Sequence, residues 1–186
     1  MRTQIEPLLT IDDLDAMPED GNRYELIEGE ILMSRAPGIT HQQVLTNLME
    51  SFLLYLAQNR IGRILPGPGL IFDKYNAVIP DLIFVSNERR DQIISGERLI
   101  AAPELVVEIL SPGTENERRD RNIKRRLYAR FGVEEYWLID PENQQAEIYR
   151  LQQGNLRLRE TLTDDDEITS PLLPGYACKA NQIFEF

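Results

Sequence analysis

"PELVVEILSPGT", residues 103–114, is the stretch that decides the fold of this chain. Its apolar run from Leu105 to Leu110 predicts a strand that is buried on both faces, yet Glu108 lies inside the run. Burying an ionised carboxylate costs several kcal/mol unless a hydrogen-bonding or charged group pairs with it. The sequence therefore predicts that another segment supplies a partner for Glu108. The plainest alternative is a structural carboxylate bonded to backbone amides or to an arginine of the next helix.

Length and composition indicate one domain, residues 1–186, that folds without cross-links. A single cysteine, Cys178, excludes an internal disulfide. No stretch approaches the roughly 20 apolar residues of a membrane span, and "MRTQIEPLLT" lacks the apolar core of a signal peptide. We therefore expect a soluble cytoplasmic protein that does not contact the membrane.

The charge balance opposes general attraction to polyanions. The chain has 31 acidic and 20 basic residues, a formal charge of −11. One segment differs, because residues 117–130 ("ERRDRNIKRRLYAR") contain seven arginines or lysines against two acids. This run is either a solvated face or a DNA-contacting surface. In the second case the contacts would come from Arg118, Arg121, Arg125 and Arg126.

Apolar periodicity and turn residues predict an α+β (mixed α/β) domain with a mixed central sheet flanked by helices. A hairpin around Glu28-Gly29 begins the domain, and a hairpin around Gly154 ends it. A capping box of Thr114 and Glu117 predicts the start of the second long helix. The expected helices are 11–17, 40–60 and 114–131, and the expected strands lie within 24–34, 70–72, 78–86, 105–111, 134–140 and 145–162.

Two carboxylates are expected to meet at neighbouring strands. Asp81 directly follows Pro80 at the start of "DLIFVS", and Glu108 lies within "LVVEILS". Mg²⁺ commonly uses one or two carboxylates and keeps several waters. Asp81 and Glu108 are therefore candidate ligands for Mg²⁺ or Mn²⁺, and the carbonyl of Ile109 could add an oxygen. Close to apolar neighbours and to Asp81, metal-free Glu108 should have a raised pKa.

Lys124 is the nearest lysine after Glu108, and metal-assisted phosphodiester cleavage uses such a cation to orient water or to offset developing charge. The apolar stripe of its helix is formed by Ile123, Leu127 and Phe131. At 100° per residue Lys124 lies about 60° from Leu127, at the rim of the stripe, from which it can reach back to Glu108. Asp120, one turn earlier, can hold Lys124 or approach the metal.

Three blocks in this order resemble a known family. They are "IPDLIFVS", "PELVVEILSPGT" and "DRNIKRRLYARFGVEEYWLIDP", and "YELIEGEILMSRAPGITHQQV" is similar to the N-terminal part of the same family. It is the bacterial family of restriction-endonuclease-like proteins built on the PD-(D/E)xK nuclease core. The resemblance covers nearly the whole chain and implies a restriction-endonuclease-like fold.

The resemblance assigns roles residue by residue. Asp81 matches the aspartate of the motif and Glu108 its acidic member, but Leu110 stands where the general pattern has lysine. The resemblance implies that the lysine has moved to the following helix, where Lys124 lies. It also implies a supporting role for His41, the only histidine, whose imidazole could ligate metal, contact substrate or simply be exposed.

Glu28, in the first hairpin, could bring a further carboxylate to the metal or be an ordinary turn glutamate. Together the residues favour a Mg²⁺-dependent DNA endonuclease that hydrolyses phosphodiester bonds, acting alone or as a homodimer. One alternative is a catalytically silent binding or scaffold protein that retains the nuclease fold. Another is a metal-dependent hydrolase of a different phosphate ester. The charge of −11 favours these alternatives.

Overall fold

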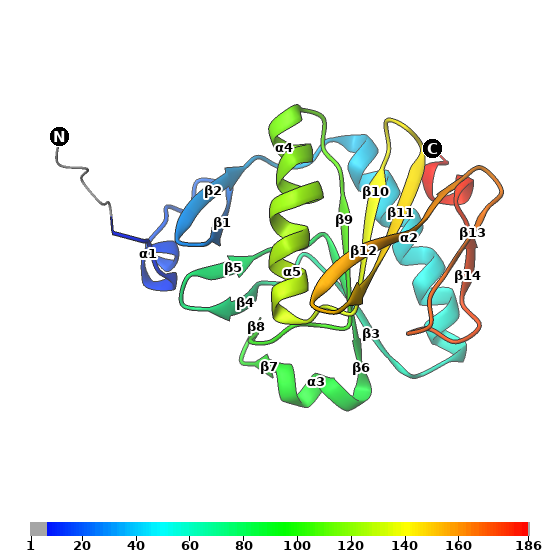
Figure 1. The fold of residues 1–186 in the computed structure, drawn as a ribbon, viewed down its shortest axis with the longest axis horizontal. Coiled ribbons are helices and arrows are strands. Elements are labelled where there is room, and N and C mark those ends of the chain that lie inside the picture. The colour runs from blue at the N-terminus through cyan, green and yellow to red at the C-terminus, as the bar shows by residue number, and fades with distance from the viewer. Residues whose placement is uncertain (1–6, 186) are drawn as a thin grey trace.

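The structure is a computed structural model that describes residues 7–185, apart from the side chains of residues 114 and 115. It contains two six-stranded sheets and a two-stranded sheet, with helices packed around them (Figure 1). The predicted mixed α+β class is confirmed. The expectation of one sheet is wrong, because the N-terminal hairpin pairs with β5 to form a second sheet rather than extending the central one.

The elements follow the predicted order, but unpredicted elements lie within residues 62–66 and 87–99 and near the C-terminus, and the strand expected over 78–86 begins only at residue 82. In chain order they are α1 (Ile11–Asp15), β1 (Arg23–Ile27), β2 (Glu30–Ser34), α2 (Ile39–Gln58), β3 (Gly62–Pro66), β4 (Leu70–Asp73), β5 (Asn76–Val78), β6 (Leu82–Ser86), α3 (Asn87–Ile93), β7 (Ile94–Ser95), β8 (Arg98–Leu99), β9 (Leu105–Ile109), α4 (Thr114–Arg118), the π-helical turn η1 (Arg119–Lys124), α5 (Arg125–Phe131), β10 (Glu135–Asp140), β11 (Gln145–Gln152), β12 (Asn155–Thr163), β13 (Glu167–Thr169), β14 (Ala177–Lys179) and the 3₁₀ helix η2 (Asn181–Phe184).

The central sheet has the strand order β12-β11-β10-β9-β6-β3, with β9 antiparallel to β6 and parallel to β10. In Figure 1, α2 lies on one face of this sheet and the α4–η1–α5 segment on the other. Val107 and Ile109 pack with α2, whereas Val106 packs with Leu127 of α5. Every residue of β9 is buried, as the apolar run in the sequence predicts. Side chains alternate along a strand, so Glu108 points to the α5 side.

The second sheet has the order β2-β1-β5-β4-β8-β7 and places the N-terminal hairpin beside the α5 face. Glu28 and Gly29 both have positive φ, 53° and 79°, which suits a tight hairpin turn. The inward end of β1, from Glu25 to Ile27, is buried. Glu25 is fixed there because one of its carboxylate oxygens, Oε1, accepts the N–H of Ile79 at 2.8 Å.

Helix α2 falls within the predicted range 40–60 apart from its first residue, and its buried face is formed by His41, Val44, Leu48, Phe52 and Leu56. Within residues 7–185, no helix combines the length and the apolar character needed to span a bilayer. Helix α4 begins at Thr114 as expected, while the predicted capping box needs the Thr114 side chain, which lies outside the described part.

Phe52 is the aromatic centre of this side of the core. Its ring stacks on Trp137 at 5.4 Å and on Tyr176 at 4.9 Å between centroids, and its side chain is fully buried. Phe52→Ala should therefore lower the free energy of unfolding by about 3–5 kcal/mol, because a cavity replaces these contacts. Urea unfolding measures this. Leu53→Ala is the matched control, because the neighbouring Leu53 is 52% exposed and its truncation should change stability by about 0.5 kcal/mol or less. Equal losses in both variants would contradict the assigned core.

Candidate active site

Glu108 finds its partners on the helical segment that covers its face of the sheet. Its oxygen Oε1 accepts hydrogen bonds from the ammonium of Lys124, at 3.0 Å, and from the hydroxyl of Tyr128. Glu108 is only 2% exposed. The buried carboxylate is thus paired by a lysine and a tyrosine, one turn apart, and not by an arginine.

Lys124 is surrounded by carboxylates. Its Nζ lies 2.9 Å from Oε1 of Glu25, 3.0 Å from Oε1 of Glu108 and 3.9 Å from Oδ1 of Asp120. Burial disfavours the ammonium, but these three acids outweigh it and raise the pKa of Lys124 above its ordinary value. Lys124 is therefore a permanent buried cation.

Asp81 is held by groups from two other elements. Its Oδ2 accepts the backbone N–H of Ile109 at 2.8 Å and is hydrogen-bonded to Nε2 of His41 at 3.0 Å. Burial opposes ionisation of Asp81, but its hydrogen bond to and electrostatic interaction with His41, together with the Ile109 N–H, lower its pKa below the ordinary value. Asp81 thus stays a carboxylate, with Oδ1 turned toward Arg23 at 4.0 Å.

Glu108 and Asp120 behave in the opposite way. Burial raises the pKa of Glu108 to about 8; Lys124 opposes this rise, and the charges of Asp81, Asp120 and Glu25 add to it. Burial likewise raises the pKa of Asp120, against the opposing charges of Lys124 and Arg119. The direction for Glu108 is the one expected from its sequence neighbours.

These side chains surround one cavity of about 50 Å³. Asp81, Glu108 and Lys124 meet there as predicted, and His41 and Asp120 lie beside them. Glu25 also lines this cavity. Three arginines also line it: Arg23, Arg35 and Arg119.

Lys124 lies at the centre of the buried helical face, not at its rim. Ile123 is 37% exposed, whereas Asp120, Lys124, Leu127 and Tyr128 are buried. The sequence prediction used apolar residues alone and therefore centred the buried face of this helix on the stripe that begins at Ile123. The buried face also contains the charged side chains of Asp120 and Lys124, which such a stripe leaves out. The face includes the π-helical turn η1, a feature frequent at functional sites. The hydroxyl of Tyr136, on β10, donates a hydrogen bond of 3.1 Å to the carbonyl of Asp120 in this turn.

The structure does not place Glu28 in the site. Its side chain is 75% exposed in the β1–β2 turn, where it lies 3.5 Å from Arg130. Glu25, three residues earlier, takes the position that the sequence interpretation gave to Glu28. The signal for Glu25 was present, since it stands beside Leu26 and Ile27 in a short apolar strand, much as Glu108 stands in β9.

The four arginines expected to form a DNA-contacting rim do not line the cavity. Arg121 bonds to Asp140 at 2.8 Å and also to Glu147, and Arg125 lies over the ring of Tyr149 at 5.0 Å. These contacts attach the helical segment to β10 and β11. The other two, Arg118 and Arg126, are exposed.

Metal binding can be judged from the donor atoms. Within the described chain, no group of three or more His, Cys, Asp or Glu side chains is placed to hold a metal. Oδ1 of Asp81 and Oε2 of Glu108 nevertheless accept no hydrogen bond from any described residue. Two carboxylate oxygens without hydrogen bonds, one of them 4.0 Å from Arg23, fit Mg²⁺ or Mn²⁺ with retained waters, and they do not fit a structural zinc site with four protein ligands.

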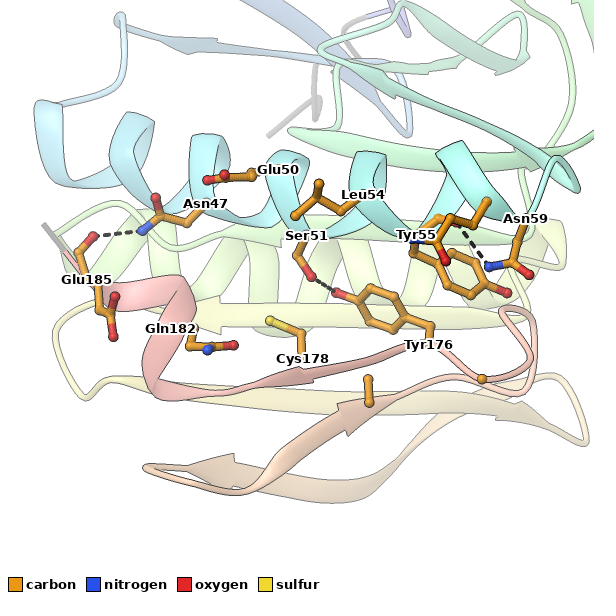
Figure 2. Close-up of a pocket in the computed structure, with 13 residues that line it drawn as sticks. Asn47, Glu50, Ser51, Leu54, Tyr55, Asn59, Tyr176, Cys178, Gln182 and Glu185 are labelled. Carbon is orange, nitrogen blue, oxygen red and sulfur yellow. Dashed lines mark hydrogen bonds between the residues drawn. The ribbon is translucent and has the colours of Figure 1, made fainter.

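The size of a hollow does not identify this site. A larger hollow of about 590 Å³ lies between α2 and the C-terminal segment (Figure 2). There Ser51 and Tyr176 share a hydrogen bond of 2.9 Å, and Asn47 donates to the carbonyl of Glu185 at 2.7 Å. These contacts attach the C-terminal segment to the helix that carries His41.

Comparisons with known proteins give the family and the fold of this chain. Residues 11–181 match the model of the Uma2 family, described as "Putative restriction endonuclease". The chain belongs to this family. Among solved structures, a crystal structure described as "a putative nuclease belonging to DUF820 from Anabaena variabilis ATCC 29413" is similar in fold. It has a TM-score of 0.78 and 21% identity, over 95% of this chain and 97% of that one. No curated protein sequence matches the chain.

Family membership confirms the resemblance seen in the sequence, and the structural likeness confirms a nuclease-like fold. Neither comparison assigns roles to individual residues. Those roles depend on the distances and charges around the cavity.

Lys124→Met should destabilise the protein by about 3–5 kcal/mol, because it leaves buried carboxylates without their cation. Urea unfolding at neutral pH measures the change. Arg126→Met, on the exposed side of the same segment, is the matched control and should change stability by about 0.5 kcal/mol or less. A Lys124→Met protein as stable as wild type would show that the lysine does not neutralise this cluster.

The stability of Glu108→Gln relative to wild type should increase as pH rises. The ordinary pKa of 4.5 rises to about 8 in the folded protein, so wild type binds the Glu108 proton more tightly when folded. The stability from that proton is present below pH 4.5 and is lost as pH rises to about 8. Without divalent metal, the stability difference between variant and wild type should therefore change by about 1–3 kcal/mol between pH 5 and pH 8. A pH-independent difference would contradict the raised pKa.

Proposed function

We propose that this chain is a Mg²⁺- or Mn²⁺-dependent endonuclease that hydrolyses phosphodiester bonds of DNA. The observation that carries the proposal is the meeting of Asp81, Glu108 and Lys124 at one cavity, although they come from three separate segments of the chain. Family membership and the nuclease-like fold support the same reaction class.

Asp81 and Glu108 would hold the metal through Oδ1 and Oε2, the oxygens that accept no hydrogen bond from a described residue. A divalent ion bound there would supply Lewis-acid polarisation and a more acidic bound water. Ile109 N–H and His41 fix the other oxygen of Asp81, so His41 serves to orient this carboxylate.

Lys124 acts as a fixed positive charge and not as a proton acceptor. The surrounding acids raise its pKa, so it remains an ammonium throughout the neutral range. In this role it orients the attacking water and offsets negative charge that develops on the phosphoryl oxygens. Glu25 and Asp120 hold the ammonium in place, and Arg119 bonds to Asp120 at 3.2 Å.

A specific observation favours the alternative of a catalytically silent binding protein. Glu108 already has a charged partner in Lys124 without any metal, so the buried cluster is internally compensated. The net charge of −11 points the same way. A metal-dependent hydrolase of another phosphate ester would use the same residues, and only the substrate distinguishes it.

Cleavage of supercoiled plasmid and of a labelled oligonucleotide in Mg²⁺ or Mn²⁺ tests the proposal. Glu108→Gln should reduce the rate by about 100-fold or more, the scale of losing one electrostatic catalytic group. Glu28→Gln is the matched control, because it removes the same charge from an exposed turn and should retain the wild-type rate. Calorimetry should show that Mn²⁺ binding is lost in Asp81→Asn, and that binding to wild type releases protons, since the ion displaces the raised-pKa proton of Glu108.

Equal cleavage by wild type and Glu108→Gln would reject the assigned site. Metal binding without cleavage of any DNA would favour the silent binding protein. Cleavage of small phosphodiesters but not of DNA would favour the other hydrolase.

A further inference from the structure

Two residues of β1 reach the cavity, and they carry opposite charges. Side chains alternate along a strand, so Arg23 and Glu25 point to the same side of β1, and both line the cavity. Glu25 binds the ammonium of Lys124, whereas Arg23 lies 4.0 Å from Oδ1 of Asp81. The second sheet therefore supplies an anion to the buried lysine and a cation to the aspartate.

The position of Arg23 bears directly on metal binding, because Oδ1 of Asp81 is one of the two oxygens proposed as metal ligands. The other oxygen of Asp81 is already bonded to the N–H of Ile109 and to His41. A divalent cation at Oδ1 would lie beside the guanidinium, and the two positive charges would repel each other. Arg23 therefore neutralises the same oxygen that a metal would use.

Arg23 is held loosely enough to leave this position. Its side chain is 39% exposed, and Asp81 is its one ion-pair partner among the described residues. Arg119, which also lines the cavity, is held more firmly, because its side chain is 16% exposed and bonds to Asp120 at 3.2 Å. Of these two arginines, Arg23 is the one that can turn away from its carboxylate at low cost.

The cavity is formally neutral before any ion binds. Its wall has equal numbers of acidic and basic side chains: Glu25, Asp81, Glu108 and Asp120 against Arg23, Arg35, Arg119 and Lys124. A divalent ion alone would add two positive charges to this neutral and largely buried set, which is unfavourable where water is excluded. A phosphodiester group brings a negative charge, and a guanidinium binds its oxygens in bidentate geometry. Metal and phosphate therefore favour each other when both bind.

We propose that Arg23 couples metal binding to phosphate binding. It neutralises Asp81 in the metal-free protein, and it turns to a phosphodiester group of the substrate when a divalent ion binds Asp81. The inference rests on the proposed function for the metal and the substrate, and adds that the free protein binds metal weakly until a phosphodiester is present. By linkage, the metal strengthens phosphate binding by the same factor.

Calorimetric titration of Mn²⁺ into wild type and Arg23→Gln tests the competition at Asp81. Removing the guanidinium should raise the affinity for Mn²⁺ by about tenfold, because the ligand oxygen loses a competing cation. Damage to the fold would lower the affinity and not raise it. Arg63→Gln is the matched control, since it removes the same charge from an exposed position of β3 that does not line the cavity, and it should bind Mn²⁺ like wild type.

Arg35→Gln separates the contact at Asp81 from the general charge of the cavity. Arg35 lines the cavity and is exposed, and it forms no ion pair with any described residue. Its removal should raise the affinity for Mn²⁺ by about twofold or less. A gain as large as that of Arg23→Gln would overturn the specific role of Arg23.

Dimethyl phosphate, a minimal phosphodiester, tests the coupling. In millimolar dimethyl phosphate, at constant ionic strength, Mn²⁺ should bind wild type about fivefold or more tightly than in sodium chloride. In Arg23→Gln the same addition should change the affinity by about twofold or less, because the residue that answers both ligands is gone.

The outcomes separate this inference from the proposed function. Equal Mn²⁺ affinity in wild type and Arg23→Gln, or an equal effect of dimethyl phosphate on both, overturns the role of Arg23, while plasmid cleavage by wild type would still support the nuclease. The expected affinities without plasmid cleavage support the coupling and reject the proposed hydrolysis. Failure of both proteins to bind Mn²⁺ in either solution overturns both.

Discussion

The ion cluster around Lys124 is the interaction on which the rest of the site depends. One ammonium, 3% exposed, lies within 4 Å of carboxylates from β1, β9 and η1. Taking such charges out of water costs several kcal/mol per ion, and only close pairing offsets the cost. The cluster therefore joins the second sheet, the central sheet and the helical segment at one point. Moving any of these elements would leave a charge buried without a partner.

The same cluster bears on the proposed binding of a divalent cation. Four acids, Glu25, Asp81, Glu108 and Asp120, share this region with one lysine, and burial raises the pKa of two of them. An added divalent ion would lower the cost of keeping those carboxylates ionised. The hydrogen bonds that Lys124 and Tyr128 make to one oxygen of Glu108 leave the other oxygen available. Internal neutralisation and metal binding are thus compatible, because they use different oxygens.

The arginines show how an acidic chain distributes its positive charge. Arg121 and Arg125 are used within the fold, where they attach the helical segment to β10 and β11. Arg23, Arg35 and Arg119 remain at the cavity. Positive charge is therefore concentrated at the cavity and is not spread over a broad surface.

The sequence by itself determined the buried strand of β9, both hairpins, the long helix α2 and the family resemblance that linked Asp81, Glu108 and Lys124. These features depend on local periodicity, on turn residues or on short ordered blocks, all of which are visible along the chain. Only the tertiary structure decided that Glu25 joins the site in place of Glu28, that Lys124 is central, and that Arg121 pairs with Asp140 and Glu147. The partner of a buried charge is set by contacts between distant segments, such as the bond from Ile79 N–H to Glu25. Local patterns of apolar residues contain no information about such contacts.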